Sequence, residues 1–396
     1  MTDINEIVRV AARGEGVTGD GRHAALAAPG DILASDGTLT HGPHHQIPPC
    51  RHFPECGGCQ LQHLDDPSYA EFVRDRVASA LDGQGLSAPI RTPIVSPPRS
   101  RRRATLHAER GVLGFSEEAS HRIVDMRECW VIRPEMFALV GPLRTLIARL
   151  APKKRVSVDL TLIDQGVDVL LGGFEATGLA ASEALIDFAQ GNKLARLSID
   201  GGYGPETRWE PDPVTITLGG IPTPFPHAAF LQATAEGEAT LVAGVKEAVA
   251  GAATIADLFA GLGTFALALP GRIYAGEGAR DALFALKVAA GAARRPVFAE
   301  HRDLFRRPLT AAELNRFDAA VLDPPRAGAR DQVEQIAQST LARLAYVSCN
   351  PSTFARDAKT LCDSGMIIEW VQPVGQFLWS THVELIAAFR RPDSPR

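Results

Sequence analysis

The chain has 396 residues, of which 45% are hydrophobic and 22% charged, with a formal net charge of −5. This length and apolar content predict a globular protein of about two to three domains, and the acidic balance is unlike that of a purely electrostatic nucleic-acid binder. No run of about 18 apolar residues occurs, which excludes a transmembrane helix, and MTDINEIVRV does not resemble a signal peptide. A cytoplasmic location is therefore expected.

The first part of the chain predicts short strands followed by a cysteine loop. Residues 1–45 contain strand-like runs broken by glycines, as in GEGVT and APGDIL, and predict a β segment too short to bury a core by itself. Residues 46–65 form a loop that holds three cysteines. A helix is expected to follow from Pro67 to about Leu81.

A central region is expected at residues 90–205, and it begins with a proline-rich extended segment. Strand-like runs such as RVSVDLTLI and GVDVLLGGF alternate there with helical stretches at 135–150 and 177–190. This mixture predicts an α+β domain built on an antiparallel sheet.

The last region, residues 206–396, changes its pattern after residue 252. Apolar runs such as TIADLF, DAAVLDPP and LAYVSC alternate with helical stretches such as ARDALFALKVAAGA. Strands that are apolar along their whole length and joined by helices predict a doubly wound, mostly parallel α/β sheet. The runs MIIEWVQPV and ELIAAF have no helix between them, so the sheet is expected to end in an antiparallel strand.

Three of the six cysteines lie close together in CRHFPECGGC, at Cys50, Cys56 and Cys59. In a reducing compartment, clustered cysteines indicate a metal site rather than disulfides. Thiolates suit both tetrahedral zinc and iron–sulfur clusters, although the C-x5-C-x2-C spacing is not a usual zinc-finger spacing. The residues alone leave both metals open.

The sequence DLFAGLGTFAL, residues 257–267, predicts a strand that turns through Gly261 and Gly263 into a helix. Glycines allow a ligand to approach the backbone, and ligands bind such sheets at the carboxyl ends of the strands. Glu277, which ends the next strand, is placed to accept hydrogen bonds from a pair of ribose hydroxyls. The same glycine pattern also fits a dinucleotide site, for which the acid comes too soon, or a tight turn without a ligand.

Two further motifs end strands that are expected at the same edge of the sheet. In DPPR, two prolines hold Asp323 rigidly after its strand, or form a structural turn. In VSCNPSTFARD, Cys349 is either a core thiol or a nucleophile, which needs an electropositive setting that Arg326 or Arg356 could supply. Glu384, in STHVELIAAF, begins the final strand; a single glutamate in a strand usually lies on a solvated face, so this residue by itself indicates no function.

Together these motifs resemble the RNA uridine-5-methyltransferase family, whose members use S-adenosylmethionine to methylate C5 of uracil in ribosomal or transfer RNA. The resemblance runs in order through most of the chain, in CxxxxxCGGCxxQH, GFSEEASHRIVDMREC, FLQ, DLFAGLGTF, DPPRAG, SCNPSTFARD and HVE. The glycine motif is generic to class I methyltransferases, whereas the first motif and the last three are specific to this family. The resemblance implies a class I, Rossmann-like methyltransferase domain at 206–396.

The resemblance implies a covalent mechanism in which Cys349 adds to C6 of uracil. Negative charge then spreads to C5 and O4, C5 takes the methyl group, and Glu384 removes the C5 proton so that the cysteine can leave. The target base must leave its stack, so an unpaired or loop uridine is expected. By positional match, the implied cofactor contacts are Gln232, Phe259, Thr264, Glu277, Asp303 and Asp323.

The resemblance also implies a [4Fe-4S] cluster held by Cys50, Cys56 and Cys59, with Cys129 in DMRECW as the fourth ligand. Its implied role is structural, tying the N-terminal loop to the central domain. The arginines of segment 99–103 and the central domain at 90–205 are candidates for phosphate contacts with RNA, and a solvated face is the alternative for the arginine run. Because the bacterial tRNA-specific branch usually lacks the cysteines, 23S rRNA is the expected substrate, and tRNA is the alternative.

The chain departs from the family pattern at four places. Its N-terminal segment resembles the TRAM RNA-binding barrel but is truncated. Thr234, in FLQAT, stands where the family usually has asparagine. The segment SRRRA at 100–104 replaces a strand that usually contains tyrosine, and Trp130 stands where proline commonly follows the fourth cysteine. Neither Cys349 nor Glu384 is affected, so the reaction class is retained.

Two other function classes fit part of the sequence. A nicotinamide or flavin oxidoreductase would use GLGTFA for a dinucleotide and the cysteines for electrons, but it leaves SCNP and HVE without a role. A non-catalytic RNA-binding factor would have no need of Cys349 and Glu384. Nothing in the sequence demands a membrane partner or an oligomer larger than a monomer.

Overall fold

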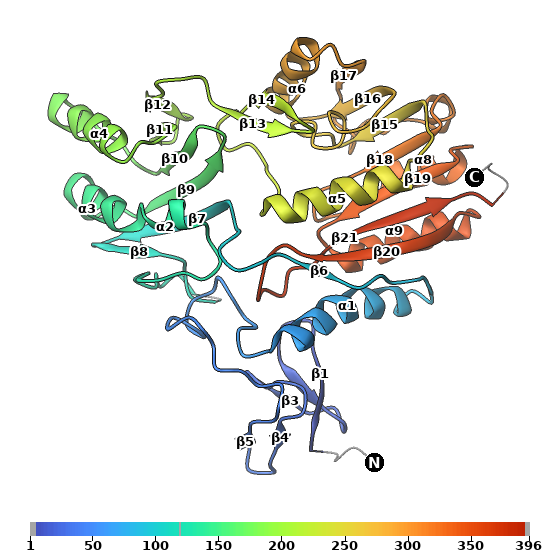
Figure 1. The fold of residues 1–396 in the computed structure, drawn as a ribbon, viewed down its shortest axis with the longest axis horizontal. Coiled ribbons are helices and arrows are strands. Elements are labelled where there is room, and N and C mark those ends of the chain that lie inside the picture. Colours follow the sequence, from blue (N-terminus) through green and yellow to red (C-terminus); the bar gives the residue numbers. More distant parts are fainter. Residues whose placement is uncertain (1–4, 119, 393–396) are drawn as a thin grey trace. The chain divides into compact units, whose positions relative to one another are not determined.

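The computed structural model describes residues 5–118 and 120–392 (Figure 1). Three parts of the predicted regions lie outside these residues: positions 1–4 of the β segment, Ala119 of the motif GFSEEAS, and positions 393–396 of the methyltransferase region. The described chain forms two compact units. The first contains the residues up to Arg76, Val95–Asp212 and Phe377–Thr381, and the second contains Val77–Ile94, Pro213–Gln376 and the residues from His382 onward.

The N-terminal strands of the first unit are short. They form a three-stranded antiparallel sheet and a separate hairpin: β1 (Ile7–Val10), β2 (Gly16–Thr18) and β3 (His23–Ala24), then β4 (Ile32–Leu33) and β5 (Leu39–Thr40). Ile7, Ala27 and Leu33 form their small core. Position 16 requires glycine because a Cβ there would lie 2.7 Å from the Ala27 side chain. The helix expected from Pro67 is α1 (Asp66–Asp82).

The central sheet of the first unit has the strand order β12-β11-β10-β9-β7-β8. Its strands are β7 (Arg103–Glu109), β8 (Val112–Gly114), β9 (Val156–Ile163), β10 (Gly166–Gly172), β11 (Arg196–Asp200) and β12 (Glu206–Trp209). The sheet is antiparallel except for β10 and β11, which are parallel because α4 (Leu179–Gly191) crosses between them. The helical stretch expected at 135–150 is divided into α2 (Pro134–Phe137) and α3 (Val140–Leu150).

The second unit is built on a sheet with the strand order β17-β16-β15-β18-β19-β21-β20-β6. These strands are β6 (Ile94–Val95), β15 (Thr254–Leu258), β16 (Arg272–Glu277), β17 (Val297–His301), β18 (Ala319–Leu322), β19 (Arg343–Ser348), β20 (Ile367–Gly375) and β21 (Glu384–Arg390). The five neighbouring strands β17, β16, β15, β18 and β19 are parallel, as predicted. The antiparallel strand β21 does not end the sheet but lies between β19 and β20, where nearly all its residues are buried.

Helices cover both faces of this sheet. They are α5 (Ala235–Ala248), α6 (Arg280–Ala292), α7 (Ala311–Leu314), α8 (Arg330–Gln338) and α9 (Pro351–Asp363), and a hairpin of β13 (Thr215–Leu218) and β14 (Ile221–Pro224) precedes them. Figure 1 shows α5 and α9 on opposite faces. A Cβ at Gly244 of α5 would lie 2.9 Å from Ile386, whereas the Phe354 ring of α9 packs against Phe389, as the strand alternation of β21 requires.

The prediction of a helix directly after Gly263 is wrong. Residues 261–268 form successive turns instead. The backbone φ angles of Phe259, Gly261 and Gly263 are 64°, 55° and 95°, and a right-handed helix cannot begin until these positions have passed. Pro270 follows closely, so too few residues remain for a regular helix.

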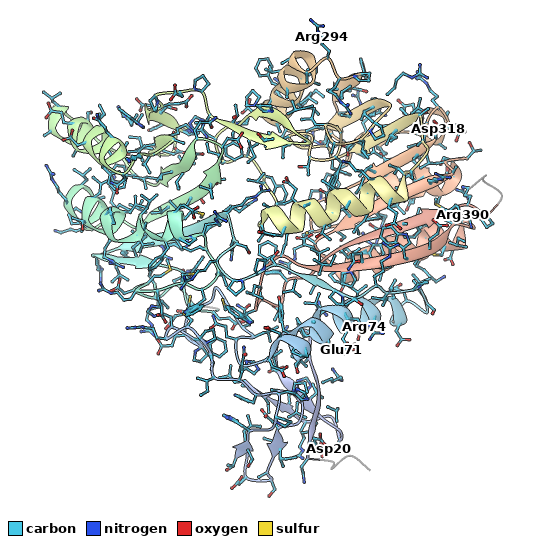
Figure 2. All side chains as sticks on the ribbon, in the orientation of Figure 1. Asp20, Glu71, Arg74, Arg294, Asp318 and Arg390 are labelled. Carbon is cyan, nitrogen blue, oxygen red and sulfur yellow. The ribbon has the colours of Figure 1, made fainter. Side chains whose placement is uncertain are left out.

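The two edges of the sheet differ in character. Asp318 and Arg390, labelled in Figure 2, lie at the edge where β18 begins, because Ala319 pairs with Arg343 and Arg343 pairs with Arg390. Asp318 ties β15 to β18 there by accepting hydrogen bonds from the Ala253 and Thr254 amides at 2.9 and 2.8 Å. The opposite edge carries the motifs described below. No helix in the described part of the chain is long and apolar enough to cross a bilayer.

Candidate active site

The strand order of the second unit reverses between β15 and β18, since β16 and β17 extend the sheet on one side and β19 on the other. In an open α/β sheet, ligands bind outside the carboxyl ends of the strands at such a switch point. The chain after β15 turns there through Gly261 and Gly263. A Cβ at Gly263 would lie 2.5 Å from Leu286, whereas a Cβ at Gly261 would meet nothing within 4 Å. The loop therefore leaves open space beside Gly261.

Glu277, at the end of β16, is held by the backbone of two loops. One carboxylate oxygen accepts from the Gly261 amide at 2.8 Å and the other from the Ala279 amide at 2.6 Å. A carboxylate oxygen accepts more than one hydrogen bond, so both oxygens retain capacity for ligand hydroxyls. The carboxylate stands at the strand end predicted from the sequence.

Asp257 is the residue of this edge to which the sequence motifs gave no role. It is 0% exposed, and neither side-chain oxygen has a partner in hydrogen-bonding geometry, although the backbone amide of Ala266 lies near enough to oppose the shift of its pKa. Burial, reinforced by the negative charge of Asp323, raises its pKa to about 8. Burial and Glu277 likewise raise the pKa of Asp323 to about 7. Such a group of carboxyls favours a ligand that brings positive charge.

Cys349 follows β19 and is partly exposed. Burial raises its thiol pKa to about 11, and the negative charges of Glu384 and Asp323 add to the shift. The two arginines that could supply an electropositive setting therefore do not dominate the charge around the thiol. Arg326 lowers this pKa only weakly, and Arg356 instead donates to Asp357 at 2.9 Å and to the Ala327 carbonyl at 3.1 Å. The thiol is protonated at neutral pH in this state.

The loop that carries Cys349 is fixed to the DPPR loop. The side-chain oxygen of Asn350 caps α9 by accepting from the Ser352 backbone amide at 3.1 Å. The side-chain nitrogen of Asn350 donates to the Arg326 carbonyl at 3.1 Å. The Thr353 hydroxyl also donates to that carbonyl, at 3.2 Å. The Asn-Pro pair thus ends the strand, begins the helix and holds two motif loops together.

Glu384 begins β21 beside Cys349, because Ser348 of β19 pairs with Leu385 of β21. It is 6% exposed, so it does not lie on a solvated face, where a single glutamate in a strand is usually found. Burial and the charge of Asp323 raise its pKa to about 8, while a side-chain hydrogen bond with Gln376 opposes the shift. A carboxyl with such a pKa accepts and returns a proton near neutral pH.

The remaining cofactor candidates lie in the same unit but in different settings. Gln232 is buried and accepts a hydrogen bond from Gln376 at 2.8 Å. The Phe259 ring packs against the Phe305 ring, with centroids 5.2 Å apart. Asp303 accepts from the Phe305 amide at 3.1 Å, and Thr264 is partly exposed in the turns after the glycine loop.

Thr234, which stands where the family usually has asparagine, is the N-cap residue of α5. Its hydroxyl caps α5 by accepting from the Gly237 amide at 3.0 Å. Threonine and asparagine both serve as N-caps, so the substitution preserves the start of this helix.

The first unit holds the four predicted cysteine ligands around one pocket. Its lining includes Cys50, Cys56, Cys59 and Cys129 with the rings of Phe53, Phe115 and Trp130. Burial raises the thiol pKa of Cys56 to about 11 and of Cys59 to about 12, and the neighbouring thiols add to both shifts. Thiols in such a pocket become thiolates only with compensating positive charge, which bound metal provides.

The pocket does not present ligands for a single metal ion. Among residues 5–118 and 120–392, no group of three or more His, Cys, Asp or Glu side chains is arranged to hold one ion. Four thiols around a shared space nevertheless supply the donor set of a polynuclear iron–sulfur cluster, in which each sulfur binds a different iron. The donor set fits such a group.

The arginine run at 99–103 is not a uniformly solvated face. Arg102 is buried, and Arg101 donates to the Arg103 carbonyl at 3.0 Å while facing the Phe377 ring at 5.3 Å. Arg99 is exposed and stacks on Trp130 at 4.8 Å. Of this run, Arg99 is thus the side chain most available to a phosphate, and Trp130 supports it.

Comparisons with known proteins agree with these motifs. The sequence model of a family described as tRNA (Uracil-5-)-methyltransferase matches residues 295–390. The chain is 50% identical to a protein of Zymomonas mobilis described as an uncharacterized RNA methyltransferase, over 98% of this chain and 100% of that one. It is 31% identical to the 23S rRNA (uracil(1939)-C(5))-methyltransferase RlmD of Pectobacterium carotovorum, over 89% of this chain and 82% of that one.

A solved structure shares the fold over nearly the whole chain. It is the tRNA (uracil-54, C5)-methyltransferase of Pyrococcus abyssi in complex with S-adenosyl-L-homocysteine, with a TM-score of 0.76 and 22% identity. The match covers 97% of this chain and 99% of that one. The predicted Rossmann-like methyltransferase fold is thereby confirmed.

Proposed function

The chain belongs to the RNA uracil-C5 methyltransferase family, and we propose that it transfers the methyl group of S-adenosylmethionine to C5 of a uridine in RNA. The observation that carries the proposal is the meeting of Cys349 and Glu384 at adjacent ends of β19 and β21, beside Asp323. A nucleophile and a base are thus supplied at one point of the sheet edge.

In this proposal the Cys349 thiol loses its proton to solvent, the thiolate attacks C6 of the uracil, and the C5–C6 double-bond electrons move onto C5 and O4. C5 then bonds the methyl carbon, whose bond to the cofactor sulfur breaks. Glu384 takes the proton from C5, the C5–C6 double bond reforms, and the bond from C6 to Cys349 breaks with its electrons returning to sulfur. The buried position of Glu384, with a pKa of about 8, keeps its proton exchange near neutral pH.

The carboxyl groups at the switch point support a cationic cofactor. S-adenosylmethionine supplies a methyl group on a positively charged sulfur. In this proposal the carboxyl groups of Asp257 and Asp323 stabilise the positive charge of the cofactor, and the Glu277 carboxylate accepts hydrogen bonds from its ribose hydroxyls. Positive charge near Asp323 also offsets one of the negative charges that raise the Cys349 pKa, so the thiol ionises more readily once the site is filled.

The proposed substrate is 23S rRNA, with tRNA as the alternative. Support for 23S rRNA is the RlmD relative at 31% identity, whereas the solved structure of similar fold is a tRNA enzyme. In either RNA the target base has to leave its stack to reach Cys349 at the sheet edge. The exposed Arg99 is the proposed phosphate contact.

In this proposal Cys50, Cys56, Cys59 and Cys129 hold a [4Fe-4S] cluster with a structural role. Support comes from their shared pocket and from hydrogen bonds of backbone amides that join the cysteine loop at 46–65 to the segment that carries Cys129. The Gly57 amide donates to the Ser116 carbonyl at 3.0 Å, and the Arg127 amide donates to the His52 ring at 2.9 Å. Thiolate–iron bonds from both segments would fix this arrangement.

Tritium release tests the proposal. RNA carrying tritium at uridine C5 is incubated with the protein and S-adenosylmethionine, using unmodified 23S rRNA and bulk tRNA separately. Loss of tritium with formation of 5-methyluridine in 23S rRNA is expected. Release from tRNA alone would move the substrate to the alternative, and release from neither RNA would overturn the proposed reaction.

A further inference from the structure

Gln376, the first residue after β20, lies in the second unit and has no role in the reaction described so far. Its side chain is 1% exposed. Its carbonyl oxygen accepts from the Ala233 amide at 3.0 Å, and its nitrogen donates to the Gln232 carbonyl oxygen at 2.8 Å. A side-chain hydrogen bond also joins it to Glu384.

The orientation of this amide is determined by its neighbours. The Ala233 amide is a donor, so the Gln376 atom that faces it must be the oxygen. The NH2 group therefore points the other way and donates to the Gln232 oxygen. Val374 of β20 pairs with Glu384 of β21, so Gln376, two residues further on, lies near Glu384, and its amide nitrogen is the donor for the side-chain hydrogen bond between them. A flipped side chain would set donor against donor and lose these contacts.

The position is also built sterically. A Cβ at Gly237, in the first turn of α5, would lie 2.7 Å from the Gln376 Cβ and 2.9 Å from its side-chain oxygen. Glycine at 237 thus lets the helix approach the amide, and the Thr234 cap fixes the start of the same turn. Gln376 is consequently held in one rotamer by packing and by hydrogen bonds.

We propose that Gln376 is a positioning residue that aligns the base Glu384 for removal of the C5 proton and joins it to the cofactor contact Gln232. This inference rests on the proposed function. The donated hydrogen bond restrains the direction of the Glu384 carboxylate. It also favours the ionised form of Glu384, against the effects of burial and of Asp323. The other titratable group beside Glu384 is Cys349.

The test is Gln376→Met, which keeps the volume but removes the amide, assayed by tritium release and by gel detection of the covalent RNA adduct. Losing a hydrogen bond to a charged group slows proton removal about 10- to 100-fold, the adduct accumulates, and the lower pH limb of the rate profile moves to higher pH. Gln372→Met is the matched control, because Gln372 is buried in β20 and donates to the Thr92 carbonyl at 2.7 Å. It should behave as the wild type.

Gln376→Glu provides a second variant, since a carboxylate facing Glu384 raises the base pKa further and shifts the same limb farther. Wild-type tritium release with an unchanged rate and pH profile in both variants would overturn the role of Gln376 alone. Absence of release from the wild type would instead overturn the proposed function. In a Glu384→Gln background, Gln376→Met should add no further loss of proton removal, and an additional loss would show that Gln376 acts elsewhere.

Discussion

The mutual influence of Cys349 and Glu384 gives a prediction that needs neither RNA nor cofactor. Glu384→Gln removes the negative charge that, after burial, contributes most to raising the Cys349 pKa to about 11. Burial remains, so the pKa should fall by up to about one unit and stay above that of an ordinary thiol, which corresponds to an increase in thiolate of up to about tenfold at a fixed pH.

The pH range of the effect follows from the base itself. The Glu384 pKa is about 8, so this carboxyl is largely neutral below that pH in the wild type and repels the thiolate only above it. The wild type and Glu384→Gln should therefore react alike near pH 7 and diverge as the pH rises through 8, with the variant faster.

The assay is the rate of alkylation by iodoacetamide, read from peptide masses between pH 7 and 10. Trypsin separates Cys349 from Cys362 because Arg356 and Lys359 lie between them. Glu369→Gln is the matched control, since Glu369 pairs with Arg390 at 2.8 Å at the other edge of the sheet. An identical pH profile for wild type and Glu384→Gln, or a slower variant, would refute the coupling inferred from the structure.

Two further predictions concern the glycine loop and the cysteine pocket. Gly263→Ala should lower the free energy of unfolding by about 2–5 kcal/mol, because it combines a positive φ with a Cβ 2.5 Å from Leu286. Gly261→Ala has a positive φ but no neighbour within 4 Å of its Cβ, so it should lower the free energy of unfolding by only about 1–2 kcal/mol. Denaturant titrations measure both values. Equal costs would contradict this reasoning. Cys129→Ser should lower the iron and sulfide bound after anaerobic purification, while Cys362→Ser, outside the pocket, should not; full iron in both, or zinc without sulfide in the wild type, would contradict the cluster proposal.

Much of the second unit was predictable because its strands carry their own signal. Runs such as the one ending at Leu322 are apolar throughout, and parallel strands buried on both faces require that pattern. The place of β21 was not predictable, since its insertion between β19 and β20 depends on pairing partners distant in sequence. The burial of Glu384 follows from this insertion.

The electrostatics of the site were the least predictable part. Local sequence placed arginines near Cys349, but Arg356 is engaged by Asp357, and carboxyls from β18 and β21 determine the potential at the thiol. Asp257 was overlooked because an acid at a strand end reads like any other until the burial of its two side-chain oxygens is seen. The role of Gln376 was likewise not predictable, because it depends on the packing of α5 against this residue, which is distant from the helix in sequence.

The most direct test of the central claim is the mass of the protein after incubation of Glu384→Gln with S-adenosylmethionine and a short RNA that contains the unmodified target uridine. The account predicts a covalent protein–RNA species carrying one added methyl group, because Cys349 adds to C6 and the C5 proton stays in place. The species should be absent from the double variant Cys349→Ala, Glu384→Gln. Methylated free RNA without any adduct, or an adduct that survives loss of Cys349, would contradict the account.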